Sequence, residues 1–169
     1  MSTNKTAQFT KDLANKKMQV IKEFNAPVAD VWAAWTKSEL LDQWWAPKPW
    51  KAETKSMDFT EGGKWAYFMV GPEGERHGAV INYKKIESGK SFTGEDAFTD
   101  DNGQVNKEMP VMTWHVQFVS VADGTKVTID ITSPTEEGIE TLLKMGFQEG
   151  FTMGLGNLDE LLAKKAAKA

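Results

Sequence analysis

The sequence contains no cysteine, so disulfide bonds, thiolate metal sites and cysteine nucleophiles are excluded. Arginine is nearly absent as well. The 20 basic residues include a single arginine, Arg76, so an arginine cluster for bidentate binding of carboxylates or phosphates cannot form. No apolar run approaches the ~20 residues that a membrane span requires, and the polar residues 1–17 lack the apolar segment of a signal peptide. We therefore expect a cytoplasmic protein without a membrane span.

Signals for charged partners and for cofactors are also lacking. The net charge is −4, so nothing attracts a nucleic-acid backbone. The two histidines do not lie at a metal-ligand spacing, and no phosphate-binding loop, dinucleotide fingerprint or serine elbow occurs. We predict neither a metal nor a cofactor. His115 is predicted to point outward from its strand, and His77 to be an exposed turn residue, with a place at a cavity mouth as the alternative.

Large apolar rings are the abundant feature of the sequence. It has seven tryptophans and nine phenylalanines but only two tyrosines. Rings without a polar group suit a hydrophobic core or the wall of an apolar cavity. A chain of 169 residues has the size of one domain and can bury one sizeable core.

Hydrophobic periodicity divides the chain into strands and helices. Residues 18–25 alternate as in a strand, and the helical spacing of apolar residues after Pro27 and after Thr36 predicts two short helices. Apolar residues that recur every three to four positions predict one long amphipathic helix over 135–163. Between these helical regions, glycine-rich turns separate runs of strand character at 51–58, 64–70, 78–86, 91–98, 110–121 and 125–132.

This order predicts an α+β fold with one domain over 18–163. Residues 1–17 are predicted to be a mobile tail or a short peripheral helix, and residues 164–169 a solvated tail. The last two strands are apolar on one face, which is typical of an antiparallel sheet covered on one side. Only the final helix is long enough to cover that face. A curved sheet around a helix leaves a hollow between them unless side chains fill it, and we predict the functional site there.

Several motifs occur in a recognisable order. They are Ala26-Pro27 with Val31-Trp32, Trp44-Trp45-Ala46-Pro47, the double-glycine stretch from Asp58 to Trp65, Gly71-Pro72-Glu73-Gly74, and Gly150-Phe151 with Leu158 and Leu161. This set resembles the START/SRPBCC superfamily, in the branch of the C-terminal domain of heat-shock-protein-90 ATPase activators, although many relatives have Trp where Phe151 stands. The resemblance implies the helix-grip fold, a curved antiparallel sheet around a long C-terminal helix with two short helices after the first strand.

The predicted cavity wall combines aromatic rings with adaptable methionines. The lining candidates are Trp35, Trp44, Met57, Trp65, Phe68, Ile81, Tyr83, Phe92, Phe98, Met112, Trp114, Phe118, Phe147 and Phe151. Most of these rings could equally belong to a packed core. The alternation in 64–70 leaves open whether Trp65 and Phe68 face the same side.

Three glycines are predicted to form a stripe of small residues on the final helix, at Gly146, Gly150 and Gly154. Each costs about 1 kcal/mol relative to alanine in a helix interior, so the stripe requires a compensating reason. Close packing against the sheet or the short helices is the reading we favour. The alternative is room for a ligand beside Phe147 and Phe151.

Two polar side chains are candidates for chemistry in the cavity. Asp96 faces inward if its strand is regular, and a buried carboxylate must be paired or have a raised pKa. We favour a bulge near Gly94 or Glu95 that turns Asp96 outward, because glycine within a strand often marks a bulge. The phenol of Tyr83 could form a hydrogen bond with a ligand oxygen.

The favoured function is non-enzymatic binding of an apolar or aromatic small molecule in the cavity. A chaperone-partner role is implied by the resemblance alone, and we expect 169 residues to be too few for the separate N-terminal domain of such activators. An enzyme of the cyclase or hydrolase type ranks third, because Asp96 and Tyr83 are its only candidate groups. The fold by itself does not decide among these three functions. The sequence also leaves the oligomeric state open.

Overall fold

The computed structural model describes residues 6–100, 102–107, 111–122 and 124–168. Residue 110, the predicted start of one strand, and parts of both predicted tails lie outside these ranges. One antiparallel sheet has eight strands in the order β1-β2-β8-β7-β6-β5-β4-β3. The strands are β1 (Gln8–Asp12), β2 (Lys17–Phe24), β3 (Lys51–Met57), β4 (Lys64–Val70), β5 (Arg76–Glu87), β6 (Ser91–Thr99), β7 (Met112–Val121) and β8 (Gly124–Thr132).

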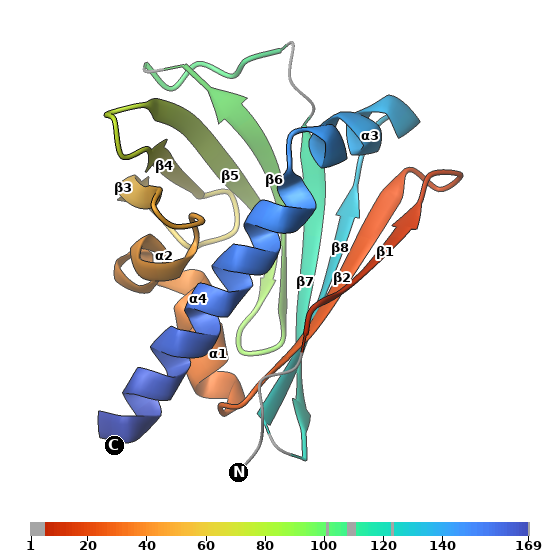
Figure 1. Ribbon diagram of the computed structural model, residues 1–169. Helices are drawn as coiled ribbons and strands as arrows, with labels where there is room; N and C mark the ends of the chain where they lie inside the picture. Colours follow the sequence, from red (N-terminus) through yellow and green to blue (C-terminus); the bar gives the residue numbers. More distant parts are fainter. Residues whose placement is uncertain (1–5, 101, 108–110, 123, 169) are drawn as a thin grey trace.

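Helices cover one side of this sheet. Within the described residues they are α1 (Val28–Thr36), α2 (Ser38–Trp44), α3 (Glu136–Lys144) and α4 (Phe147–Lys168). Figure 1 shows the sheet curving around α4, which crosses its concave side, with α1 and α2 beside α4. The predicted α+β class and curved antiparallel sheet are confirmed. The two short helices are also confirmed, although they follow the second strand.

The additional strand β1 lies in the segment predicted to be a mobile tail or a peripheral helix. It pairs with β2 so that Phe9 lies opposite Val20, and the partly buried Phe9 packs against the core. Strand β1 forms because of a tertiary contact: the edge of β2 offers backbone hydrogen-bonding groups for it to pair with. A local sequence pattern does not reveal such a contact. The sheet therefore begins ahead of the predicted domain boundary at residue 18.

The long helix predicted over 135–163 is in fact two helices. α3 ends at Lys144, and Gly146 has a φ of +86°, a left-handed conformation that glycine adopts without strain. The amide of Gly146 donates to the carbonyl of Leu143 at 3.1 Å and closes the last turn of α3. The apolar spacing continues across this break, which is why periodicity did not reveal it. α4 also extends to Lys168, beyond the predicted end.

Close backbone contact docks α4 against the segment that follows α2. Leu155 and Leu158 of α4 are almost completely buried. Asn157 donates from Nδ2 to the carbonyl oxygen of Ala46 at 3.1 Å. A Cβ at Gly154 would lie 3.2 Å from the carbonyl oxygen of Trp45, so the absent side chain permits the contact. This docking places Trp45 between α4 and the sheet.

Candidate functional site

The space between the sheet and α4 is filled at one end and hollow at the other. Trp45 lies at the division. Its ring centroid is 5.9 and 5.4 Å from those of Trp35 and Trp65 on the filled side. On the hollow side it is 5.8 and 6.1 Å from those of Trp114 and Phe151. The filled side retains a void of about 10 Å³, about the minimum that holds one water molecule. Tryptophan rings therefore occupy part of the predicted hollow.

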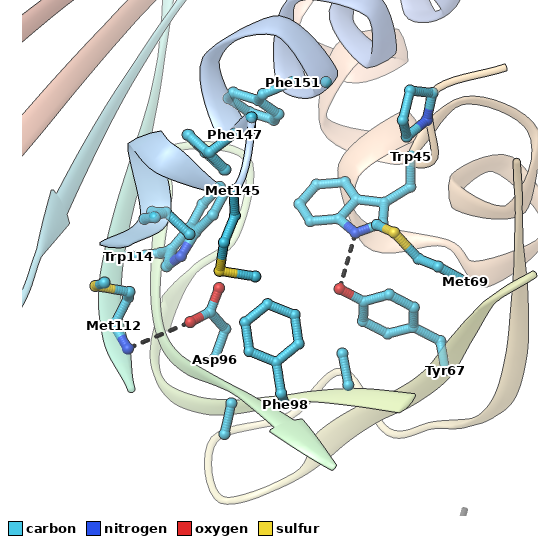
Figure 2. A pocket seen from close by; sticks show the side chains of 16 residues that line it. Trp45, Tyr67, Met69, Asp96, Phe98, Met112, Trp114, Met145, Phe147 and Phe151 are labelled. Atoms are coloured by element: carbon cyan, nitrogen blue, oxygen red, sulfur yellow. Dashed lines mark hydrogen bonds between the residues drawn. The ribbon is translucent and has the colours of Figure 1, made fainter. Parts of the chain in front are cut away.

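A cavity of about 230 Å³ remains on the other side of Trp45. Its wall is built by β4 to β7, the segment after α2, the end of α3 and the start of α4 (Figure 2). The lining residues are Trp45, Pro47, Tyr67, Met69, Ala79, Asp96, Ala97, Phe98, Met112, Trp114, Leu142, Met145, Gly146, Phe147, Gly150 and Phe151. Among the described residues of this wall, Asp96 is the one charged side chain.

The cavity adjoins a wider and more open groove of about 870 Å³. Pro47, Met69, Phe98 and Met145 line both spaces and therefore form the neck between them. Met145, in the link between α3 and α4, is 49% exposed. A molecule in the groove would thus meet two methionines, a proline and a phenylalanine before it reached the interior.

The groove beyond the neck carries charged and polar groups. His77 is exposed and stacks on Trp50 with ring centroids 5.5 Å apart. Arg76 lies over the ring of Phe68, with its guanidinium carbon 4.1 Å from the ring centroid. Both basic residues line the groove and not the inner cavity. His77 is therefore exposed, as predicted, but it lies in β5 and not in a turn, and it is near the cavity mouth.

Asp96 points into the cavity. The register of β6 against β7 is regular and places Asp96 opposite Met112. The irregularity lies in β5, after Tyr83. The predicted bulge near Gly94, which would have turned Asp96 outward, is therefore wrong. Gly94 has a packing reason instead, because a Cβ there would lie 2.8 Å from Cγ2 of Ile81.

Burial raises the pKa of the Asp96 carboxyl to about 7. The backbone N–H of Met112 donates to Oδ1 of Asp96 at 3.3 Å and opposes this rise. The indole N–H of Trp114 also favours the charged form, although it forms no hydrogen bond of standard geometry. Asp96 is partly exposed because it lines the cavity, but protein atoms surround most of its carboxyl group. The carboxyl is therefore poised to gain or lose a proton near neutral pH.

Tyr67 of β4 is the second polar group in the cavity wall. Its hydroxyl accepts a hydrogen bond from Nε1 of Trp45 at 2.9 Å. Burial holds the pKa of Tyr67 well above its usual range, and the negative charge of Asp96 adds to the rise. The phenol therefore stays protonated. In the view of Figure 2, the ring of Phe98 lies between the Tyr67 hydroxyl and the Asp96 carboxyl.

The structure separates thirteen of the fourteen predicted lining residues into two groups, and the fourteenth, Phe68, belongs to neither. The cavity wall includes Phe98, Met112, Trp114, Phe147 and Phe151. The buried core instead holds Trp35, Trp44, Trp65, Ile81, Tyr83, Phe92 and Phe118, with Met57 partly buried against it. The rings of this second group pack against one another and leave no space for a ligand. Phe68 lies on the opposite face of β4, because Trp65 and Tyr67 take the inward positions.

Sequence reasoning missed several wall residues, among them Tyr67 and Met145. Tyr67 follows Trp65 at an alternate position of β4, so this run held a signal, but its parity was ambiguous. Met145 lies at the end of a helix, where periodicity does not determine the direction of a side chain.

The three glycines predicted as one helical stripe have different surroundings. Gly146 lies in the link between α3 and α4, outside either helix. A Cβ at Gly150 would meet only Cγ of Pro47, at 3.7 Å, and Gly150 lines the cavity. Gly154 packs against backbone. Close packing, the explanation we favoured, therefore applies to Gly154. The alternative, room for a ligand beside Phe147, applies to Gly150.

The remaining polar candidates lie apart from the cavity. His115 is in hydrogen-bond contact with Thr93 through Nδ1 at 2.9 Å, on the face of the sheet away from α4, and Tyr83 is buried in the core. In the part of the chain that the structure describes, no three His, Asp or Glu side chains gather as ligands for a metal ion. None of the described helices has the length and apolar character needed to cross a membrane.

A curved antiparallel sheet around a long C-terminal helix, with a cavity between them, defines the helix-grip fold of the START/SRPBCC superfamily. Within it, the chain belongs to the family described as Activator of Hsp90 ATPase homolog 1-like protein, whose model matches residues 25–163.

Several solved structures resemble the chain over most of its length. The crystal structure of protein Ms6760 from Mycobacterium smegmatis is 28% identical with a TM-score of 0.87, and the match covers 94% of this chain and 97% of that one. A solution structure of a protein from Arthrobacter aurescens is 30% identical with a TM-score of 0.88, covering 93% and 91%. Protein NE0264 from Nitrosomonas europaea is 27% identical with a TM-score of 0.79, covering 91% and 98%. No curated protein sequence matches the chain.

Proposed function

We propose that this protein binds a small apolar or aromatic molecule in the cavity between β4 to β7 and α4. The observation that carries the proposal is an apolar-walled cavity of about 230 Å³ between the sheet and α4, open toward the outer groove. Protein interiors are close-packed and contain few voids larger than a water molecule. An apolar cavity of ~150 Å³ is large enough for benzene. The site thus suits a molecule of one or two rings better than a sterol or a long fatty acid.

The neck supplies the entry route. Met69 and Met145 are unbranched and flexible, so they can move aside without displacing the backbone. Met145 lies next to Gly146, at the junction of two helices, and is half exposed. The open groove outside the neck would collect the ligand before it passed inward.

Isothermal titration calorimetry tests this proposal, because its signal does not overlap the absorption and emission of aromatic probes. We expect indole and naphthalene to give a saturable heat of binding, and a sterol or a long-chain fatty acid to give none. Ala79→Leu, which adds volume inside the cavity, should abolish the response. Val119→Leu is the matched control, since Val119 is 54% exposed. The proposal fails if no compound gives a saturable change, or if Ala79→Leu binds as tightly as the wild type.

The family description raises a second candidate, a chaperone-partner role. A pull-down with the middle and N-terminal domains of heat-shock protein 90 tests it directly. Ala79→Leu separates the two functions, because filling the cavity should remove ligand binding and leave a surface contact intact. The third candidate function is an enzyme. Of the two groups that we considered for catalysis, Asp96 lines the cavity and Tyr83 does not.

A further inference from the structure

We infer that the molecule bound in this cavity is an arylalkylamine in its ammonium form, with the ammonium group on Asp96 and the aromatic ring among the aromatic walls. This inference rests on the proposed function and names the chemical class of the ligand. It follows from the charge, the partners and the surroundings of Asp96.

The negative charge of Asp96 has no positive partner inside the cavity. Among the described lining residues, none is basic. Arg76 and His77 lie in the outer groove, against Phe68 and Trp50 respectively. The groups that face the carboxyl directly are the N–H of Met112 and the indole of Trp114, both neutral. A buried carboxylate is stabilised most by a counter-charge, and a bound ammonium group would supply it.

Aromatic rings form much of the cavity wall, and Trp114, Phe98 and Met145 lie beside the carboxyl, with Phe147 and Phe151 farther along the cavity (Figure 2). Phe147 and Phe151 stack at 5.2 Å between centroids, and Trp114 meets Phe151 edge-on at 5.5 Å. Ring faces attract cations, and the attraction grows when water is excluded. A cation in this site would therefore gain from both Asp96 and the rings. An anionic ligand would be repelled by Asp96, and a neutral alcohol would gain one ordinary hydrogen bond.

The other elements around the cavity add no competing charge. Tyr67 of β4 remains protonated, and Leu142, Phe147 and Phe151 from α3 and α4 are apolar. Asp100, which follows β6, lines the groove and accepts the backbone N–H of its own turn. An ammonium group that pairs with Asp96 favours the ionised carboxyl, so amine binding should release a proton and strengthen as the pH rises through neutrality.

Three probes with one ring and different head groups test the inference. They are 2-phenylethylamine, 2-phenylethanol and 3-phenylpropionate, titrated calorimetrically at about pH 8. We expect the amine to bind at least about tenfold more tightly than the alcohol, and 3-phenylpropionate to bind most weakly. Asp96→Asn keeps the shape and the acceptor for Met112. It should weaken amine binding about tenfold and change alcohol binding by less than about twofold.

Glu95→Gln is the matched control, because Glu95 is the neighbouring carboxylate and pairs with Lys84 at 3.0 Å, outside the cavity. It should leave all three affinities unchanged. A second measurement uses the wild type alone, in which amine affinity should rise by about tenfold from about pH 6 to about pH 8. This measurement decides the question even if Asp96→Asn does not fold.

The outcomes separate this inference from the proposed function. If the alcohol or 3-phenylpropionate binds as tightly as the amine, the inference is wrong and the cavity remains a binding site. An amine affinity that is insensitive to Asp96→Asn, or to pH in the wild type, overturns it as well. If these probes, indole and naphthalene all fail to bind, the proposed function falls and the inference with it.

Discussion

Lys22 of β2 and Asp159 of α4 form an ion pair between the sheet and the helix that covers it, with Nζ 3.0 Å from Oδ2. The two side chains are only 3% and 10% exposed. Lys22 also donates to the carbonyl of Glu23 at 3.2 Å. Burial raises the pKa of Asp159 although Lys22 opposes the rise. The pair therefore fixes the position of α4 against β2 at an appreciable desolvation cost.

Asp159→Asn should reduce the free energy of unfolding by about 3 kcal/mol, because it removes the carboxylate that pairs with the buried ammonium of Lys22 at 3.0 Å. Urea unfolding followed by tryptophan fluorescence measures the loss. The control is Glu160→Gln, which removes the neighbouring carboxylate. Glu160 pairs with Lys48 at 3.2 Å, but the two side chains are 63% and 66% exposed. Glu160→Gln should lower the free energy of unfolding by less than about 1 kcal/mol. If both variants lose the same amount, the Lys22–Asp159 pair does not have the special role that we assign to it.

Asp96 should make the unliganded protein less stable as the pH rises. Its pKa is about 7 in the folded state against an ordinary value of 3.8, so the folded state holds the proton more tightly. The stability that the bound proton adds is fully present below about pH 4 and is lost as the pH approaches about 7. A pKa change of this size corresponds to at most about 4 kcal/mol, and solvent in the cavity lowers that figure.

Urea midpoints of the wild type and Asp96→Asn across this range measure the effect. The difference between the two proteins should change steadily between about pH 4 and about pH 7 in favour of Asp96→Asn. Glu95→Gln serves again as the control. Parallel pH profiles for the wild type and Asp96→Asn would show that the carboxyl titrates normally.

Gly146 and Gly150 should respond to alanine in opposite directions. Gly146→Ala places a Cβ at a φ of +86° and should cost about 1 kcal/mol. Gly150→Ala lies within α4, where its Cβ would meet only Pro47 at 3.7 Å, so it should gain up to about 1 kcal/mol from helix propensity. Thermal unfolding of the two variants compares them. Stabilisation by Gly146→Ala would contradict the left-handed link between α3 and α4.

Trp45→Ala should join the cavity to the small void beyond it. The truncation should cost about 3–5 kcal/mol, because it removes a large buried ring. The variant should also bind a tricyclic aromatic such as phenanthrene, which the wild type should exclude. Trp50→Ala is the control, since Trp50 is only partly buried and stacks on His77 at the rim. Phenanthrene binding by the wild type, or by Trp50→Ala alone, would show that Trp45 does not divide the two spaces.

Local patterns were sufficient to predict most of the architecture. The alternation in β7 and β8, the glycine-rich turns and the apolar spacing of the helices depend on neighbours a few residues apart, so they are readable along the chain. The ordered motifs were sufficient for the family as well. Local patterns also showed that Asp96 would face inward if its strand were regular.

The tertiary structure decided where space is left and what lines it. The irregularity opposite Gly94 lies in β5, after Tyr83, and not in β6 itself, and this depends on packing between strands. The break at Gly146 and the docking of Gly154 against backbone place Trp45 between a filled half and a hollow half. Strand and helix periods repeat locally, whereas a cavity is what remains after side chains distant in sequence have packed. For that reason the sequence determined which fold forms, and only the tertiary structure determined that Asp96 faces an open cavity.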